Sequence, residues 1–118
     1  MSTNPERPVT VILVTNDGMG TAEVALRHKL IGVYLKLLLE HDYLPAAICF
    51  YADGVKLVVS GSPVLDVLHQ IEAKGAHLVS CVTCLNYYGL NDKVAVGIVG
   101  GMHDIVELQH RAQKVITL

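Results

Sequence analysis

Two cysteines separated by two residues, Cys81 and Cys84, are the side chains in this sequence best suited to chemistry. The segment HLVSC at 77–81 is predicted to be a short strand that ends at Cys81, and a short helix over 84–90 follows it. Unpaired backbone N–H groups at a helix start favour the thiolate, which is the nucleophilic form of a thiol. Two thiols about one helical turn apart suit dithiol redox chemistry or persulfide transfer. The plainer interpretation is a pair of buried, unreactive cysteines.

The third cysteine, Cys49, lies inside the apolar segment 46–51 and is predicted to be buried in the core. An odd number of cysteines argues against a framework of structural disulfides. Structural zinc is usually held by two cysteine pairs, or by one pair with two histidines. Only one pair is present and His77 lies on a predicted strand, so we predict no metal site within the chain. A metal ion shared between subunits stays an alternative.

Polar residues near other strand ends are predicted to share a crevice with the cysteines. In parallel α/β sheets, ligands bind at the carboxyl ends of the strands. The residues predicted to line the crevice on this basis are Asn16, Asp17, Gly18, Asp53 and His103. His103 follows a Gly-Gly turn, and a histidine there is a candidate proton carrier.

The turn 16–21 connects a strand to a helix, which is where phosphate groups bind in many α/β proteins. The dinucleotide-binding fingerprint requires a third glycine at the position that Glu23 occupies here. A carboxylate at that position repels pyrophosphate, so a simple tight turn is the favoured interpretation. No cofactor is predicted, and binding of a nucleotide or flavin stays an alternative.

Strand-like and helix-like segments alternate along the chain and predict one α/β fold. Strands are expected at 9–15, 46–51, 77–81, 94–99 and 115–118, and helices at 21–41, 62–74, 84–90 and 102–113. Thr21 and Ser62 are expected to cap two of the helices, and the segment 55–59 is ambiguous. The alternation predicts a three-layer α/β/α fold with a mainly parallel sheet of about five strands.

Composition excludes several classes of function. The formal net charge is −2, and the chain has one Phe, five Tyr and no Trp, which disfavours nucleic-acid binding. The apolar segment 9–14 is too short to span a membrane and has no signal-peptide features, so a cytoplasmic location is expected. Residues 1–8 are expected to form a flexible lead-in and residues 9–118 a single domain. Hydrophobic residues make up 52% of the chain, which is consistent with a buried parallel sheet or with an oligomer.

The segment VSCVTCLNYYGL at 79–90, followed by a strand and a Gly-Gly turn, resembles the DsrE-like superfamily (DsrE, DsrF and TusD). The resemblance is closest to the C-terminal domain of YedF-type proteins. It extends to VILVTNDGMG at 11–20, to the segment 51–75, and to MHDIVE at 102–107, and so covers nearly the whole chain in order.

The resemblance implies a sulfur carrier that assembles into a homotrimer or homohexamer. It implies that Cys81 accepts sulfur as a persulfide, that Cys84 is an auxiliary or resolving thiol, and that Asn16, Asp17 and Gly18 line the site. A sulfur-donor protein or a TusA-like carrier is the implied partner. Relatives often have arginines where this chain has Tyr87 and Tyr88. The alternatives are a non-catalytic oligomeric binding module and a small nucleotide- or flavin-binding protein that uses the turn Asn16–Thr21.

Overall fold

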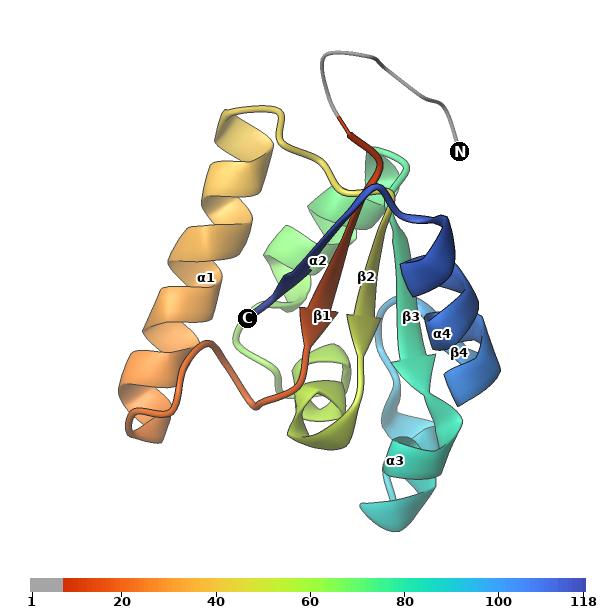
Figure 1. Ribbon diagram of the computed structural model, residues 1–118. Coiled ribbons are helices and arrows are strands. Elements are labelled where there is room, and N and C mark those ends of the chain that lie inside the picture. Colours follow the sequence, from red (N-terminus) through yellow and green to blue (C-terminus); the bar gives the residue numbers. More distant parts are fainter. Residues whose placement is uncertain (1–7) are drawn as a thin grey trace.

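Five parallel strands form a single sheet at the centre of the protein (Figure 1). The computed structural model describes residues 8–118, so the predicted lead-in, residues 1–8, lies outside the described residues except for Pro8. The strands are β1 (Thr10–Val14), β2 (Ala47–Phe50), β3 (His77–Cys81), β4 (Ile98–Gly100) and β5 (Lys114–Thr117). Their order across the sheet is β4-β3-β2-β1-β5, and every paired neighbour is parallel.

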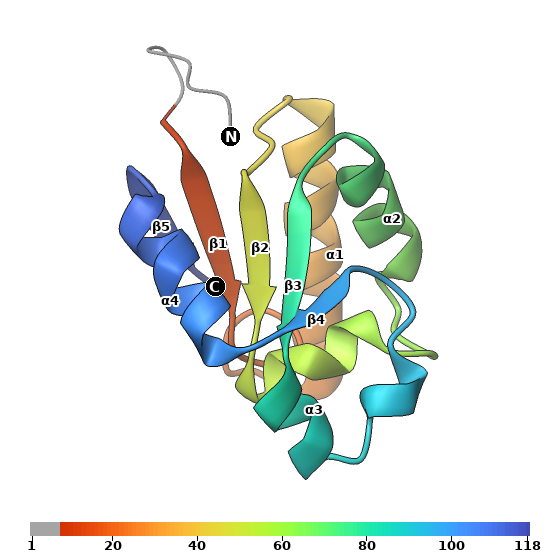
Figure 2. The same cartoon turned by 90° about the vertical axis from the view of Figure 1, so that its right-hand side faces the viewer.

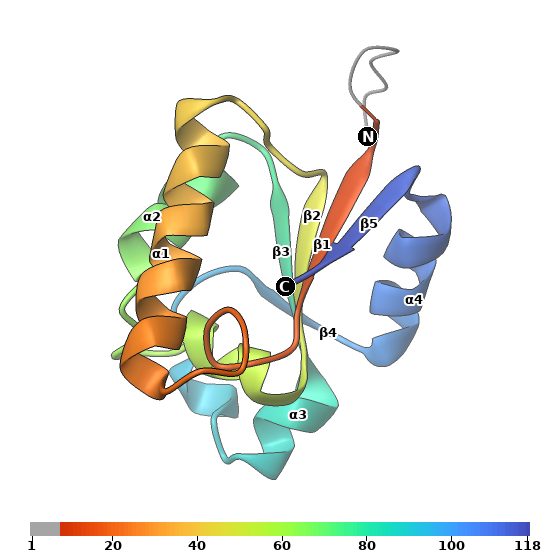
Figure 3. The same ribbon diagram turned by 60° about the vertical axis from the view of Figure 1, so that its left-hand side comes forward.

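Helices cover both faces of the sheet, which confirms the predicted three-layer α/β/α fold. The α-helices are α1 (Val24–Glu40), α2 (Leu65–Ala73), α3 (Val82–Tyr87) and α4 (Met102–Arg111), and two 3-10 helices are η1 (Ala52–Val58) and η2 (Asn91–Lys93). Helices α1 and α2 lie on one face and α4 lies on the other (Figure 3). The chain leaves β4 at one edge and reaches β5 beyond β1, so the connection through α4 crosses the sheet.

The alternation of side chains along the central strands builds one core on each face of the sheet. Ile12 and Ile48 pack in the cluster beneath α1 and α2. Val11 and Cys49 pack with Ile105 of α4 in the other cluster. Burial of each such aliphatic side chain contributes about 1.5–3 kcal/mol. Cys49 is fully buried, as the sequence predicts.

Two helices begin later than the sequence predicts. The helix expected from Thr21 begins at Val24, and no side chain caps it. Arg27 holds the preceding residues in a loop, because its Nη1 donates a hydrogen bond to the Ala22 carbonyl. The helix expected from Ser62 begins at Leu65, and Ser62 Oγ instead accepts the N–H of Val64 in the turn before it.

The segments around η1 and β4 also differ from the expectations. The ambiguous segment 55–59 is mostly 3-10 helix, within η1. The strand expected at 94–99 is only Ile98–Gly100, because Gly97 has φ +77 and turns the chain before it. A Cβ on Gly97 would lie 2.7 Å from the Leu78 carbonyl oxygen, so a glycine is needed there. The helix expected at 84–90 is α3 and begins at Val82.

Helix α1 keeps an apolar stripe on its outer side. Leu26, Leu30, Val33 and Leu37 recur at spacings of four, three and four residues and are each between 40% and 51% exposed. Within residues 8–118, no helix has the length and apolar character needed to cross a membrane.

Candidate functional site

The ends of β2 and β3 bring two distant segments together at the carboxyl edge of the sheet. The two strands are parallel neighbours, and Phe50 pairs with Ser80. Beyond these residues the chain enters η1 on one side and α3 on the other. Figure 2 shows η1 and α3 side by side beneath the strands. Parallel register therefore places residues 51–58 against residues 81–88.

Cys81 and Cys84 form a pair with one buried and one accessible sulfur. Cys81 ends β3 and occupies the N-cap of α3 in extended conformation, with φ −71 and ψ 120. It is 1% exposed, whereas Cys84, one turn along α3, is partly exposed. Both thiols are free, and Cys84 packs against the apolar cluster that contains Cys81. We call Cys81 the inner thiol and Cys84 the outer thiol.

The outer thiol accepts a hydrogen bond from the first residue of η1. The Ala52 N–H donates to Cys84 Sγ at 3.1 Å. Ala52 has φ +52, in the left-handed region that costs a non-glycine residue roughly 1–2 kcal/mol. Gly54 fixes η1 against β1, since a Cβ there would lie 2.0 Å from the Val14 carbonyl oxygen. The backbone around the sulfur is therefore held by close packing.

The pKa of the Cys84 thiol lies above its ordinary value, which is opposite to the effect expected of a helix start. Burial raises this pKa most, the Ala52 N–H lowers it, and the neighbouring Cys81 raises it. Loss of hydration disfavours the thiolate more than one backbone hydrogen bond stabilises it. The effect of the helix start is therefore outweighed by burial at Cys84.

Beside the outer thiol, Asp53, Lys56 and Tyr88 interact with one another across η1 and α3. The Tyr88 hydroxyl donates a hydrogen bond to Asp53 Oδ1, and Lys56 Nζ lies 3.3 Å from the same oxygen. Lys56 Nζ also lies 4.5 Å from the centre of the Tyr88 ring. The hydroxyl and the ammonium hold the pKa of Asp53 below its usual value, and Asp53 raises the pKa of Tyr88.

The turn that contains Asn16, Asp17 and Gly18 is held mainly by its own neighbours. The Asp17 carboxylate lies 2.9 Å from His28 Nε2, and Arg27 Nε donates to the Asp17 carbonyl. In the described part of the chain, the contacts found for this turn do not include either thiol. Arg27 connects it to the site electrostatically, because its charge helps to lower the pKa of Asp53.

The DsrE/DsrF-like family matches residues 10–118, almost the whole described chain. The chain belongs to this family. Its fold is similar to that of the YchN protein of E. coli, with a TM-score of 0.68, 17% identity, and coverage of 92% of this chain and 98% of that one. It is also similar to MTH1491, a protein of unknown function from Methanobacterium thermoautotrophicum, with a TM-score of 0.69, 18% identity, and coverage of 92% and 97%. None of the curated proteins matches the chain.

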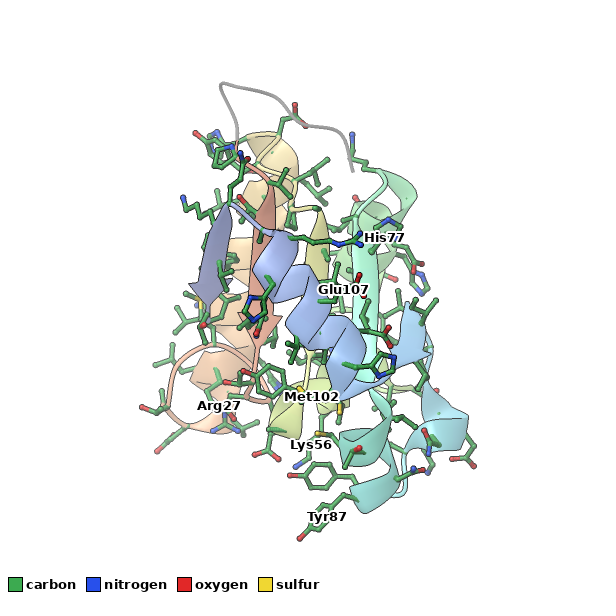
Figure 4. All side chains as sticks on the ribbon, turned by 45° about the vertical axis from the view of Figure 1, so that its right-hand side comes forward. Arg27, Lys56, His77, Tyr87, Met102 and Glu107 are labelled. Atoms are coloured by element: carbon green, nitrogen blue, oxygen red, sulfur yellow. The ribbon has the colours of Figure 1, made fainter. Side chains whose placement is uncertain are left out.

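The end of α3 carries two adjacent tyrosines. The rings of Tyr87 and Tyr88 meet edge to face with centroids 5.2 Å apart. Lys56 reaches Tyr88 from η1 and supplies a cation over its ring. Figure 4 shows Lys56, Tyr87, Arg27 and Met102 toward the same end of the molecule, with His77 nearer the other end.

His103 lies at a neighbouring strand end in this DsrE/DsrF-like chain but faces solvent. Gly100 of β4 pairs with Cys81, and His103 follows three residues later on α4. Its side chain is 83% exposed, and Nε2 lies 3.3 Å from Asp104 Oδ1. Residues 8–118 contain no group of three or more His, Cys, Asp or Glu side chains that could hold a metal ion.

Sequence reasoning missed Ala52, Lys56 and the contact of Tyr88 with Asp53. Ala52 acts through its backbone N–H, which its residue type does not reveal. Lys56 and Tyr88 are 32 residues apart, so only the pairing of β2 with β3 brings them together. Asp53 was predicted as a site residue, because it follows the end of a predicted strand.

Proposed function

We propose that this chain is a sulfur carrier that accepts sulfane sulfur on the Cys81–Cys84 pair and passes it on as a persulfide. The DsrE/DsrF-like family is associated with sulfur relay, which gives the coarse assignment. The observation that supports the finer assignment is the placement of the two cysteines one helical turn apart at the carboxyl edge of the sheet, with the Ala52 N–H directed at the outer thiol.

In the proposed reaction, a cysteine thiolate attacks the terminal sulfur of a donor persulfide. A new Cys–S–SH group forms, and the donor leaves as a thiolate, so that the sulfane sulfur moves without net oxidation. Because Cys81 is 1% exposed, the donor reaches Cys84 first. A second transfer then gives the sulfur to Cys81, where burial shelters the persulfide. Cys81 is thus the carrier, and Cys84 is the auxiliary thiol.

Two groups near the outer thiol favour an anionic sulfur chain and oppose the loss of hydration that raises the pKa of Cys84. The Ala52 N–H stabilises negative charge on Cys84 Sγ. Lys56 supplies a cation on the same side of the site, although Asp53 neutralises part of its charge. The donor is therefore proposed to be a protein or small molecule with a terminal persulfide, and the acceptor a thiol carrier of the TusA-like type.

Intact-mass spectrometry tests the proposal after exposure to polysulfide or to a loaded cysteine desulfurase. The parent chain is expected to gain sulfur that a reductant removes. Cys84→Ser is expected to load most slowly, because the thiol that remains in the pair is the buried Cys81, whereas Cys81→Ser is expected to load at the accessible Cys84. Cys49→Ala is the matched control, since Cys49 is fully buried within β2 and is expected to take no part. Equal loading of all three cysteine variants would contradict the proposal.

We further propose that the chain forms a homo-oligomer, a trimer or hexamer, through the apolar stripe of α1. An exposed row of aliphatic side chains of this kind is usually covered by a partner. Light scattering coupled to size-exclusion chromatography measures the mass in solution. Leu30→Glu is expected to lower that mass, and a parent chain that is already monomeric would contradict the proposal.

A further inference from the structure

The two thiols lie so close together that each is a potential attacking group for a persulfide on the other. Cys84 lies one helical turn from Cys81, and its side chain packs against the apolar cluster that contains Cys81. Residues three apart at a helix start lie on one face, with Cβ atoms about 5–6 Å apart. A disulfide needs Cβ atoms about 3.5–4.5 Å apart, so a small movement of the short helix α3 is sufficient.

Resting on the proposed function, we infer that the loaded pair releases free sulfide by closing a Cys81–Cys84 disulfide. The thiolate of one cysteine attacks the Sγ that bears the sulfane sulfur. The new S–S bond joins the two cysteines, and HS⁻ leaves. The two cysteine sulfurs together lose two electrons, and the sulfane sulfur gains them, so the donor persulfide is the only oxidant required.

The surroundings of the pair favour this closure. The Ala52 N–H at 3.1 Å stabilises charge on Cys84 Sγ, whether that sulfur attacks or carries the persulfide. Cys81 is buried beneath α4 in a cluster with Val79 and Ile105, and Cys84 packs against the same cluster. The outer thiol is therefore the group already positioned to reach a persulfide on the inner one.

The inference also places the protein in a reaction sequence. A persulfide-forming reaction supplies its substrate, and a sulfide-consuming reaction uses its product. The disulfide that remains must be reduced before the next cycle, and a dithiol reductant does so by thiol–disulfide exchange. The protein would thus deliver sulfur at the sulfide oxidation level when no acceptor thiol is bound.

The experiment follows the fate of one sulfur atom after loading. The reduced Cys49→Ala chain, in which the pair holds the only thiols, is loaded with less than one equivalent of polysulfide sulfur and desalted. Intact mass and released sulfide are then followed without reductant. Loss of the added sulfur should yield a chain two hydrogens lighter than the reduced form, with one sulfide released for each disulfide.

Single-cysteine chains separate the inference from the proposed function. In the Cys49→Ala background, Cys81→Ser and Cys84→Ser should release sulfide about tenfold more slowly or slower still, since the attacking group is absent. If the paired chain keeps its persulfide as long as these variants do, the inference fails while the carrier function stands. If no chain takes up sulfur, the carrier function fails.

Discussion

Gly54→Ala is expected to destabilise the protein because η1 has no room for a side chain against β1. The added Cβ would lie 2.0 Å from the Val14 carbonyl oxygen and 2.7 Å from the Val14 carbonyl carbon. Val14 is fully buried in a central strand, so η1 must move instead. That movement stretches the hydrogen bond from the Tyr51 N–H to the Val14 oxygen, now 3.1 Å.

The size of the effect follows from two contributions. Overpacking of a tight core costs about 1–3 kcal/mol, and loss of a hydrogen bond adds roughly 1 kcal/mol. Gly54→Ala is therefore expected to lower the free energy of unfolding by roughly 2–4 kcal/mol, a large part of the total for a small domain. Urea unfolding followed by circular dichroism measures it, and faster hydrogen exchange of the Tyr51 amide reports the local movement.

Two other glycines provide matched controls for Gly54→Ala. Gly61 has φ +91 with open space around it, so Gly61→Ala tests backbone strain alone and should cost about 1–2 kcal/mol. Gly32 lies within α1, and its nearest neighbour to an added Cβ, Val64 Cγ1, is 3.9 Å away. Gly32→Ala should stabilise the protein by roughly 0.5–1 kcal/mol. A Gly54→Ala chain as stable as Gly61→Ala would refute the close-packing argument.

Further predictions concern Cys49, Asp53 and Tyr88. Burial raises the pKa of Cys49 from 9.0 to about 11. The stability that the buried thiol contributes is therefore complete below a pH of 9.0 and is lost as the pH rises through about 11. Urea unfolding between these pH values should therefore show a steeper decline for the parent than for Cys49→Ala, and equal slopes would contradict the assignment. Tyr88→Phe should raise the pKa of Asp53, measured by NMR of its carboxyl carbon, because the hydroxyl is the main cause of its low value; an unchanged titration would rule out the hydrogen bond. Asp53→Asn should lower the pKa of Tyr88, followed by ultraviolet absorption of the phenolate, and no shift would mean that the two groups are not coupled in solution.

The α/β fold was predictable because its signals are local. Continuous aliphatic segments such as 9–15 mark strands that are buried on both faces, and the alternation with helices leaves few topologies. The place of the cysteine pair was also predictable, since a strand was expected at 77–81 and a short helix after it. Boundaries were less accurate where a distant contact decides them, as with Gly97, which must fit against Leu78.

Which of the two thiols is accessible was decided by the tertiary structure. Strand alternation puts Cys81 on the same side as Val79, but it does not say whether that side is covered. The side is buried because the connection from β4 to β5 carries α4 across it, and Ile105 packs there. The contacts made by Ala52, Lys56 and Tyr88 likewise depend on the pairing of β2 with β3. Local strand-forming patterns were enough to predict the candidate cysteines and the edge of the sheet where they lie. The accessibility of the two thiols, the hydrogen bond to Cys84 and the raised pKa of Cys84 arise from segments that only the folded chain brings together.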